Sequence, residues 1–201
     1  MARVHPGETV GSWMMKGVID FLTSNSNEAV FIRKNYVVKL IPMLNPDGVI
    51  YGNYRTSLAG CDLNRRWLIP NEILHSEIYY AKKMILNFSK GREIALICDL
   101  HGHSGLHNIF MYGNRFEEDN FSCRVFPFIL SKINKAFYFG NCSFNMQKFK
   151  LGCARINLFN ELEFPNIFTM EASFSGCKFV RFYFQTEYRV LMKILILVHR
   201  F

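Results

Sequence analysis

The chain has 201 residues, of which half are hydrophobic and a fifth are charged, and its formal net charge is +8. This composition excludes a disordered chain, which would contain fewer apolar residues and more charge. The length suits a single domain over residues 1–201, and the basic balance favours acidic partners such as nucleic acid, an anionic membrane surface or acidic peptides.

The first half of the chain predicts helices that alternate with strands. Apolar residues at helical spacing indicate a helix over residues 13–22, and a β-branched run ended by proline indicates a buried strand over 36–41. Residues 45–48 form a strong turn signal before a long polar loop. A second amphipathic helix is expected over residues 71–88.

The second half continues the alternation. Residues 94–100, 108–112 and 165–170 are expected to form strands, and residues 121–133 a helix. Thr186 is in a position to cap a last helix. Strands alternating with helices indicate an α/β layered fold.

The sequence also indicates a cytoplasmic location. No apolar leader opens the chain, and its longest apolar stretch, 190–198, is much shorter than the roughly 20 residues of a membrane span. The six cysteines show no C-x-x-C spacing and are expected to be reduced thiols. We therefore expect no membrane partner.

Two segments contain candidate metal ligands. His5 and Glu8 are three residues apart and can face one cation, although such a pair is common by chance. His101 and His103 follow a predicted buried strand, and either fits a third ligand position on spacing grounds; the alternative is a loop histidine satisfied by hydrogen bonds. Two histidines and one glutamate would leave a fourth position open for water, as in catalytic zinc sites.

Two further segments contain candidate catalytic and binding residues. Arg55 and the sequence Asn64-Arg65 lie in the long loop, where an arginine fork matches a carboxylate or a phosphate; the alternative is a solvated basic loop. Glu171 follows an apolar run, where partial desolvation can tune its pKa for work as a base; the alternative is a capping or salt-bridged glutamate.

Taken together, these segments resemble the M14 zinc carboxypeptidases, and more narrowly the cytosolic carboxypeptidase branch, which trims glutamates from protein tails. The matching segments follow the family's order: ARVHPGET, IPMLNPDGVIYGNYRTSLAGCDLNRRW, CDLHGHS, NIFMYG and TMEASFSGC. The resemblance implies an α/β fold with a mixed central β-sheet flanked by helices. Because little chain precedes the first candidate ligand, we expect the family's first strands to be lacking.

The resemblance also implies a role for each site residue. One zinc ion would be bound by His5, Glu8 and His101, but not by His103. Arg55 would polarise the scissile carbonyl and Glu171 would act as the general base. The remaining roles are in substrate binding: Asn64 and Arg65 would hold the terminal carboxylate, and Arg155 would face the side chain of a glutamate.

The function implied is that of a metallocarboxypeptidase that removes glutamates from polyglutamylated proteins such as tubulin, in the cytosol and at microtubules or cilia. One alternative is a catalytically inactive, truncated relative that binds acidic tails without cutting them. A nucleic-acid-binding protein is a second alternative, but it rests on charge and aromatic content alone, and we expect no nucleic-acid partner.

Overall fold

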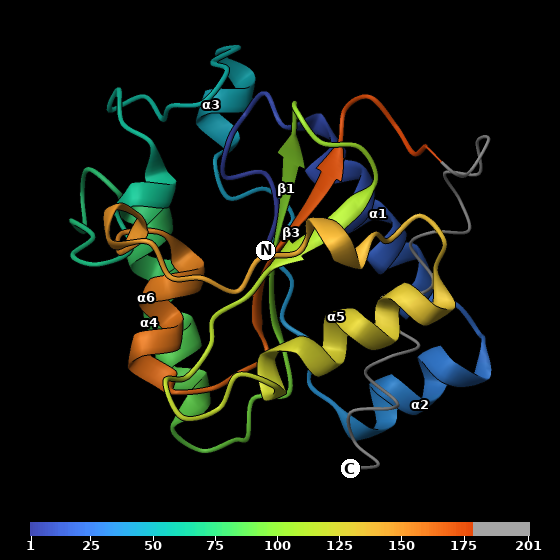
Figure 1. Ribbon diagram of the computed structural model, residues 1–201. Helices are drawn as coiled ribbons and strands as arrows, with labels where there is room; N and C mark the ends of the chain where they lie inside the picture. Colours follow the sequence, from blue (N-terminus) through green and yellow to red (C-terminus); the bar gives the residue numbers. More distant parts are fainter. Residues whose placement is uncertain (179–201) are drawn as a thin grey trace.

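The computed structural model describes residues 1–178 (Figure 1). Their sheet contains β1 (Ile97–His103), β2 (Ile109–Tyr112) and β3 (Ile167–Ser173), in the order β1-β3-β2. Strand β1 runs parallel to β3 and β2 runs antiparallel to it, so the sheet is mixed. In this register His101 is the direct neighbour of Glu171.

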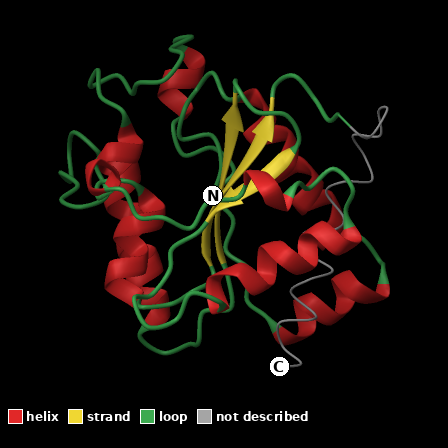
Figure 2. Cartoon of the chain, viewed as in Figure 1, coloured by secondary structure: helices red, strands yellow, loops and turns green. Residues whose placement is uncertain are grey.

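Helices cover both faces of the sheet (Figures 1 and 2). On one face lie α1 (Thr9–Thr23), α2 (Asn27–Asn35) and α5 (Ser122–Ile133), and on the other lie α4 (Ser76–Ser89) and α6 (Ala154–Leu162). The short helix α3 (Pro46–Ile50) and three 3-10 turns, η1 (Leu63–Arg65), η2 (Phe139–Asn141) and η3 (Lys148–Lys150), complete the described elements. The predicted α/β fold with a mixed, helix-flanked sheet is confirmed.

Alternation along the strands separates the core from the polar site. Leu100, Phe168 and Met170 point into the hydrophobic cluster formed with α1 and α5. Their neighbours along the strands face the other way because successive side chains of a strand alternate between its two faces. Asp99 and His101 therefore share the opposite face with Glu171.

The predicted buried strand over residues 36–41 is wrong. This segment is extended but pairs with no strand among the described residues, and Val37 and Leu40 are exposed. A β-branched run forms a strand only where a neighbouring strand satisfies its backbone groups. Here the segment forms one wall of an open groove instead.

Other predicted elements are present with shifted bounds. The helix expected over 71–88 begins at Ser76, because the side chain of Asn71 accepts hydrogen bonds from two following amides and forms a turn. The strands expected over 94–100 and 165–170 each lie two to three residues later, where β1 and β3 pair with one another. The turn signal at 45–48 is the capped start of α3, where Asn45 accepts from the Gly48 amide at 3.0 Å.

The sequence patterns missed α2 and α6, which are short helices with weak periodicity. The helix expected after Thr186 lies outside the described residues. Within residues 1–178, no helix is both long enough and apolar enough to cross a membrane.

Candidate metal centre and active site

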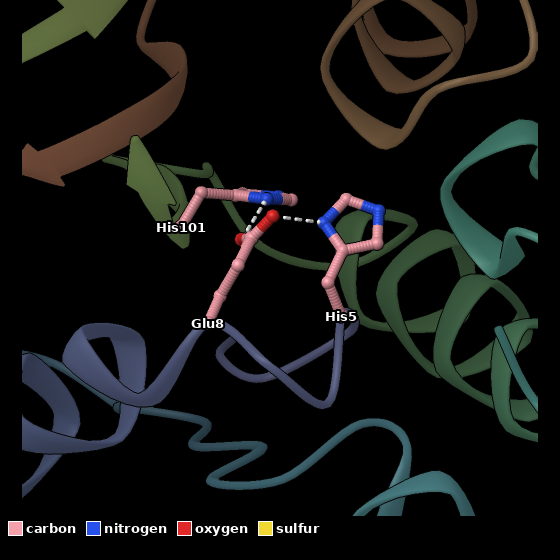
Figure 3. Close-up of side chains that lie close together, drawn as sticks. All are labelled: His5, Glu8 and His101. Carbon is pink, nitrogen blue, oxygen red and sulfur yellow. Dashed lines mark hydrogen bonds and ion pairs between the residues drawn. The ribbon is translucent and has the colours of Figure 1, made fainter. Parts of the chain in front are cut away.

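Three buried side chains converge at one end of the sheet (Figure 3). His5 and Glu8 come from the loop that leads into α1, and His101 comes from β1. Nδ1 of His5 lies 2.6 Å from one oxygen of Glu8, and Nδ1 of His101 lies 3.0 Å from the other. One potential ligand atom from each residue lies within 4.8 Å of those of the other two.

The far nitrogens of both imidazoles are held by carboxylates. Nε2 of His5 lies 3.0 Å from Asp62, and Nε2 of His101 lies 2.7 Å from Asp99. Each histidine is therefore oriented with Nδ1 toward the cluster, as in carboxylate–histidine–metal triads. Two imidazole nitrogens and one carboxylate form a donor set that zinc binds well, so these residues fit the metal that the sequence predicted.

Shifted proton affinities show how strongly these groups interact. Burial alone would raise the pKa of Glu8, but hydrogen bonds with His101 and His5 outweigh it and hold this pKa well below its usual range. Burial would likewise lower the pKa of His101, but Asp99 and Glu8 raise it well above its usual value. The site therefore holds positive charge around an ionised glutamate, and a metal ion would take the place of the imidazole protons.

Glu171 lies beside this cluster, and its pKa is shifted in the opposite direction to that of Glu8. It is buried, and its Oε2 has no hydrogen-bond partner among residues 1–178. Burial, reinforced by the negative charges of Glu8 and Asp99, raises the pKa of Glu171 to about 7 against an opposing contribution from His101. A carboxylate with a pKa near neutrality can both accept and release a proton.

Arg55 lies next to the cluster, between Glu8 and Asp62 on one side and solvent on the other. Its side chain is half-exposed and donates to Asp62 at 2.8 and 2.9 Å, and one of its nitrogens lies 3.7 Å from Glu8. Asp62 thus holds both Arg55 and His5, and these contacts help to lower its pKa to about 2 although burial opposes them. Because its side chain is partly exposed, Arg55 can also donate hydrogen bonds to an anion that enters from solvent.

Asn64 and Arg65 lie in η1, next to Asp62. The side-chain oxygen of Asn64 accepts a hydrogen bond from the Ala154 amide at 2.9 Å, which leaves its amide nitrogen to donate. Arg65 is more exposed and donates to the carbonyl of Asn64 at 2.9 Å. The loop thus gathers Arg55, Asn64 and Arg65 around Asp62, the carboxylate that also contacts His5.

Arg155 is buried at the start of α6, and no described carboxylate forms an ion pair with it. Its guanidinium donates to the Gly113 carbonyl and to the side chain of Asn114. Tyr112 interacts electrostatically with both Arg155 and Glu171, so the arginine lies on the site's side of the sheet. A buried cation without an anionic partner is unusual in a folded protein.

His103 does not join the cluster. Its Nδ1 accepts hydrogen bonds from the Gly105 and Leu106 amides, and its ring packs against Phe110. The residues that sequence reasoning missed are Asp62 and Asp99. Asp99 could have been found because it precedes His101 by two residues and so shares its strand face, whereas Asp62 lies 57 residues from His5 and gave no such signal.

The chain belongs to the zinc carboxypeptidase family, M14, whose sequence profile matches residues 1–137. Within that family it falls in the cytosolic carboxypeptidase branch. It is 44% identical over 192 residues to cytosolic carboxypeptidase 1 of Mus musculus, and 47% identical over 180 residues to cytosolic carboxypeptidase 3 of Bos taurus. These matches cover 88% and 87% of this chain but only 16% and 18% of the two relatives.

Solved structures show the same fold. The metallo-carboxypeptidase from Pseudomonas aeruginosa superposes with a TM-score of 0.83 at 24% identity, covering 98% of this chain and 56% of that one. The metallo-carboxypeptidase from Burkholderia cenocepacia gives 0.82 at 22% identity, covering 99% and 55%. The described elements therefore correspond to about half of a zinc carboxypeptidase fold.

Proposed function

We propose that this chain contains the active site of a zinc metallocarboxypeptidase, a peptide hydrolase that removes residues from the C-terminus of a peptide or protein. The observation that carries the proposal is the cluster of His5, Glu8 and His101, whose imidazoles are held by carboxylates and whose neighbour Glu171 has a pKa near neutrality. Membership of the zinc carboxypeptidase family supports it.

In this proposal His5, Glu8 and His101 hold one zinc ion per chain. When bound, the ion would polarise the scissile carbonyl and lower the pKa of a water molecule. Glu171 accepts the proton of the attacking water and then transfers it to the leaving amine. Arg55 shares the negative charge that develops on the carbonyl oxygen.

The proposed role of Asn64 and Arg65 is to bind the substrate's terminal carboxylate. The amide nitrogen of Asn64, whose side-chain oxygen already accepts from the Ala154 amide, and the guanidinium of Arg65 would be the donors. Hydrogen bonds from such donors to a carboxylate are strong because the acceptor is charged. A site that requires a free carboxylate acts only at chain ends, which makes the enzyme an exopeptidase.

We further propose that the residue removed is acidic, with glutamates of polyglutamylated tails, such as those of tubulin, as the substrate. The support is the buried cation of Arg155, which forms no ion pair with a carboxylate of the described residues, and the net charge of +8, which attracts acidic tails. The relatives' name places their activity in the cytosol, and we propose the same compartment for this protein, including its microtubules and cilia.

Zinc content tests the metal site first. We expect about one zinc per chain by elemental analysis of the metal-reconstituted protein, and loss of that zinc in His101→Ala. The matched control is His103→Ala, because His103 lies outside the cluster. A folded, monodisperse protein that binds no zinc would overturn the proposal.

Turnover of matched peptides tests the substrate. We expect cleavage of a peptide ending in glutamate, and a loss of at least tenfold in kcat/KM for Arg155→Met on that peptide but not on one ending in glutamine. Arg66→Met, at an exposed arginine, controls for loss of charge alone. Zinc-dependent binding of glutamate peptides without turnover would instead favour the inactive tail-binding relative.

A further inference from the structure

A half-buried lysine, Lys150, lies beside the candidate site at the end of the turn η3. Its Nζ lies 5.5 Å from the centre of the Tyr112 ring and 5.6 Å from that of Phe149. Backbone hydrogen bonds hold the turn: the Lys150 amide donates to the Gln147 carbonyl at 2.9 Å, and the Cys153 amide donates to the Lys150 carbonyl at 3.0 Å. The backbone of Lys150 is therefore fixed while its ammonium group lies over an aromatic ring.

Tyr112 lies on the same face of the sheet as Glu171. In the antiparallel pairing of β2 with β3, Phe110 is directly opposite Glu171, so their side chains share a face. Tyr112 follows Phe110 by two residues and therefore points to that face as well. The two rings pack with their centres 5.6 Å apart. Lys150 is thus on the face of the sheet that carries the proposed base.

Two electrostatic interactions place the charge of Lys150 near the other site residues. His103, at the end of β1, interacts with both Lys150 and Glu8. Tyr112, which lies under the Lys150 ammonium group, also interacts with Arg155. Lys150 therefore adds a second positive charge to the surroundings of the site, from a different turn of the chain than Arg155.

Within residues 1–178, no carboxylate forms an ion pair with Lys150. The lysines that do form one in this part of the chain are Lys16 and Lys82. Partial burial removes some of the water around a cation, and a carboxylate would replace that water better than an aromatic ring alone. Because Lys150 is still partly exposed, an anion can reach it from solvent.

We propose that Lys150 determines specificity for the residue before the scissile bond, by binding the carboxylate of an acidic side chain at that position. The inference rests on the proposed function, in which Asn64 and Arg65 bind the terminal carboxylate and Arg155 faces the terminal side chain. The next negative charge along a polyglutamate tail is on the preceding residue. Successive side chains of an extended peptide point to opposite sides, so the two carboxylates require two separate cations.

The chemistry of lysine suits this position. Its flexible four-carbon stem and three donors can follow a carboxylate whose position varies from one bound peptide to another. Arg155, by contrast, is buried, and its guanidinium is held by the Gly113 carbonyl and the Asn114 side chain. We therefore expect Arg155 to select the terminal residue strictly and Lys150 to give a graded preference for the residue before it.

Two peptides that differ only before their terminal glutamate test this role, one ending in Glu-Glu and the other in Gln-Glu. We expect Lys150→Met to lower kcat/KM of the zinc-loaded protein about tenfold on the first peptide, as for loss of a hydrogen bond to a charged group, and to leave the second nearly unchanged. Lys150→Arg should keep most of the preference. The matched control is Lys83→Met, because Lys83 also lies 5.5 Å from the centre of a tyrosine ring, that of Tyr79, but on the exposed surface of α4.

Equilibrium binding of the same two peptides gives a readout without turnover. Calorimetry uses zinc-loaded protein in an E171Q background, with and without Lys150→Met. We expect the Kd of the Glu-Glu peptide to rise about tenfold in the double variant and that of the Gln-Glu peptide to stay nearly constant.

Two outcomes would overturn the inference. The first is equal binding of both peptides when Lys150 is present. The second is an equal loss on both peptides in Lys150→Met, which would assign the lysine to the terminal residue or to the fold. A protein that binds the Glu-Glu peptide selectively through Lys150 but cleaves neither peptide would support the inference and contradict the proposed function alone.

Discussion

Glu8 and Glu171 are two buried glutamates of one site whose pKa values move in opposite directions. Glu8 accepts hydrogen bonds from two imidazoles and the Gly102 amide, and stays ionised. One oxygen of Glu171 finds no hydrogen-bond partner in the part of the chain that the structure describes, and this glutamate binds its proton more tightly. The difference suits a ligand role for the first and a proton-transfer role for the second.

Replacing Glu171 by glutamine should raise the stability of the fold while it lowers the activity. Its pKa rises from 4.5 to about 7 on folding, so the folded metal-free protein binds this proton more tightly than the unfolded chain. The ionised side chain therefore destabilises the fold progressively above pH 4.5 and fully above pH 7. We expect E171Q to raise the free energy of unfolding by about 1–3 kcal/mol at pH 8 and to have no effect near pH 4.

Urea denaturation of metal-free protein at both pH values measures this effect. The same variant should lose roughly 10²–10⁴-fold in kcat in the zinc-loaded protein, the usual worth of a general base. Glu118→Gln, at an exposed glutamate, is the control for charge. A variant with wild-type turnover would show that another group serves as the base.

Asp99 should position His101 for the metal. Its contact with Nε2 of His101 is 2.7 Å long and buried, and loss of such a partner typically weakens metal affinity by about 10–100-fold. We expect a weakening of that size in Asp99→Asn, measured by competition with a chelator. Asp20→Asn changes an exposed carboxylate and should leave affinity unchanged; equal affinities in the two variants would contradict the role.

At the scale of elements, the loop that carries His5 and Glu8, two of the proposed ligands, is fixed by close backbone contact. Gly7 donates to the Tyr54 carbonyl at 2.7 Å, and a Cβ at Gly7 would lie 2.8 Å from that carbonyl oxygen and 2.5 Å from the Tyr54 ring. The loop thereby rests against the segment that carries Arg55. Only glycine permits this approach without a shift of one segment.

Gly7→Ala should therefore disturb the site as well as the fold. Because the methyl group would meet backbone, we expect a loss of about 1–3 kcal/mol in stability and weaker zinc binding. Gly91→Ala is the matched control, since a Cβ there would meet nothing within 4 Å. The comparison needs chemical denaturation and zinc titration of both variants; unchanged zinc affinity in the Gly7 variant would mean that the loop adapts.

Sequence periodicity correctly predicted helices and strands that pack against or pair with a neighbouring element in the structure. The helices over 13–22 and 121–133 and the strand over 108–112 are confirmed as α1, α5 and β2. Segment 36–41 has the composition of a strand, but pairing depends on a neighbour that no local pattern can supply. The sequence pattern did not predict helix α6, because this helix is buried around most of its surface and therefore lacks an apolar face opposite a polar one.

At the scale of the whole molecule, the positive net charge should act on association more than on chemistry. We expect kcat/KM for a polyglutamate tail to fall severalfold as ionic strength rises from about 0.05 to 0.5 M, because salt screens long-range attraction. A peptide with neutral residues before the same terminal glutamate should respond much less. Equal salt dependence for both peptides would argue against steering by the net charge of +8.

The sequence predicted the candidate site in two steps. Each segment contains residue types suited to binding a metal, a carboxylate or a proton, and the resemblance to a known family assigned the segments to a single site. The structure brings His5, Glu8 and His101 together with Glu171 beside them, although their separate motifs were each ambiguous. Of the two carboxylates that orient the imidazoles, Asp99 lies two residues from His101 and could have been found from the strand pattern. Asp62 could be assigned only once the fold placed it, since a contact across 57 residues leaves no local pattern.

His101 and Glu8 are 93 residues apart in the chain yet touch within the cluster. An ion bound to both would act as a cross-link that closes this loop and lowers the conformational entropy of the unfolded ensemble. For a covalent bridge, a loop of that size corresponds to about 4–5 kcal/mol in the chain-entropy model. Removing the metal would therefore loosen the packing of α1 against β1, and the melting temperature would report on metal occupancy as directly as turnover does.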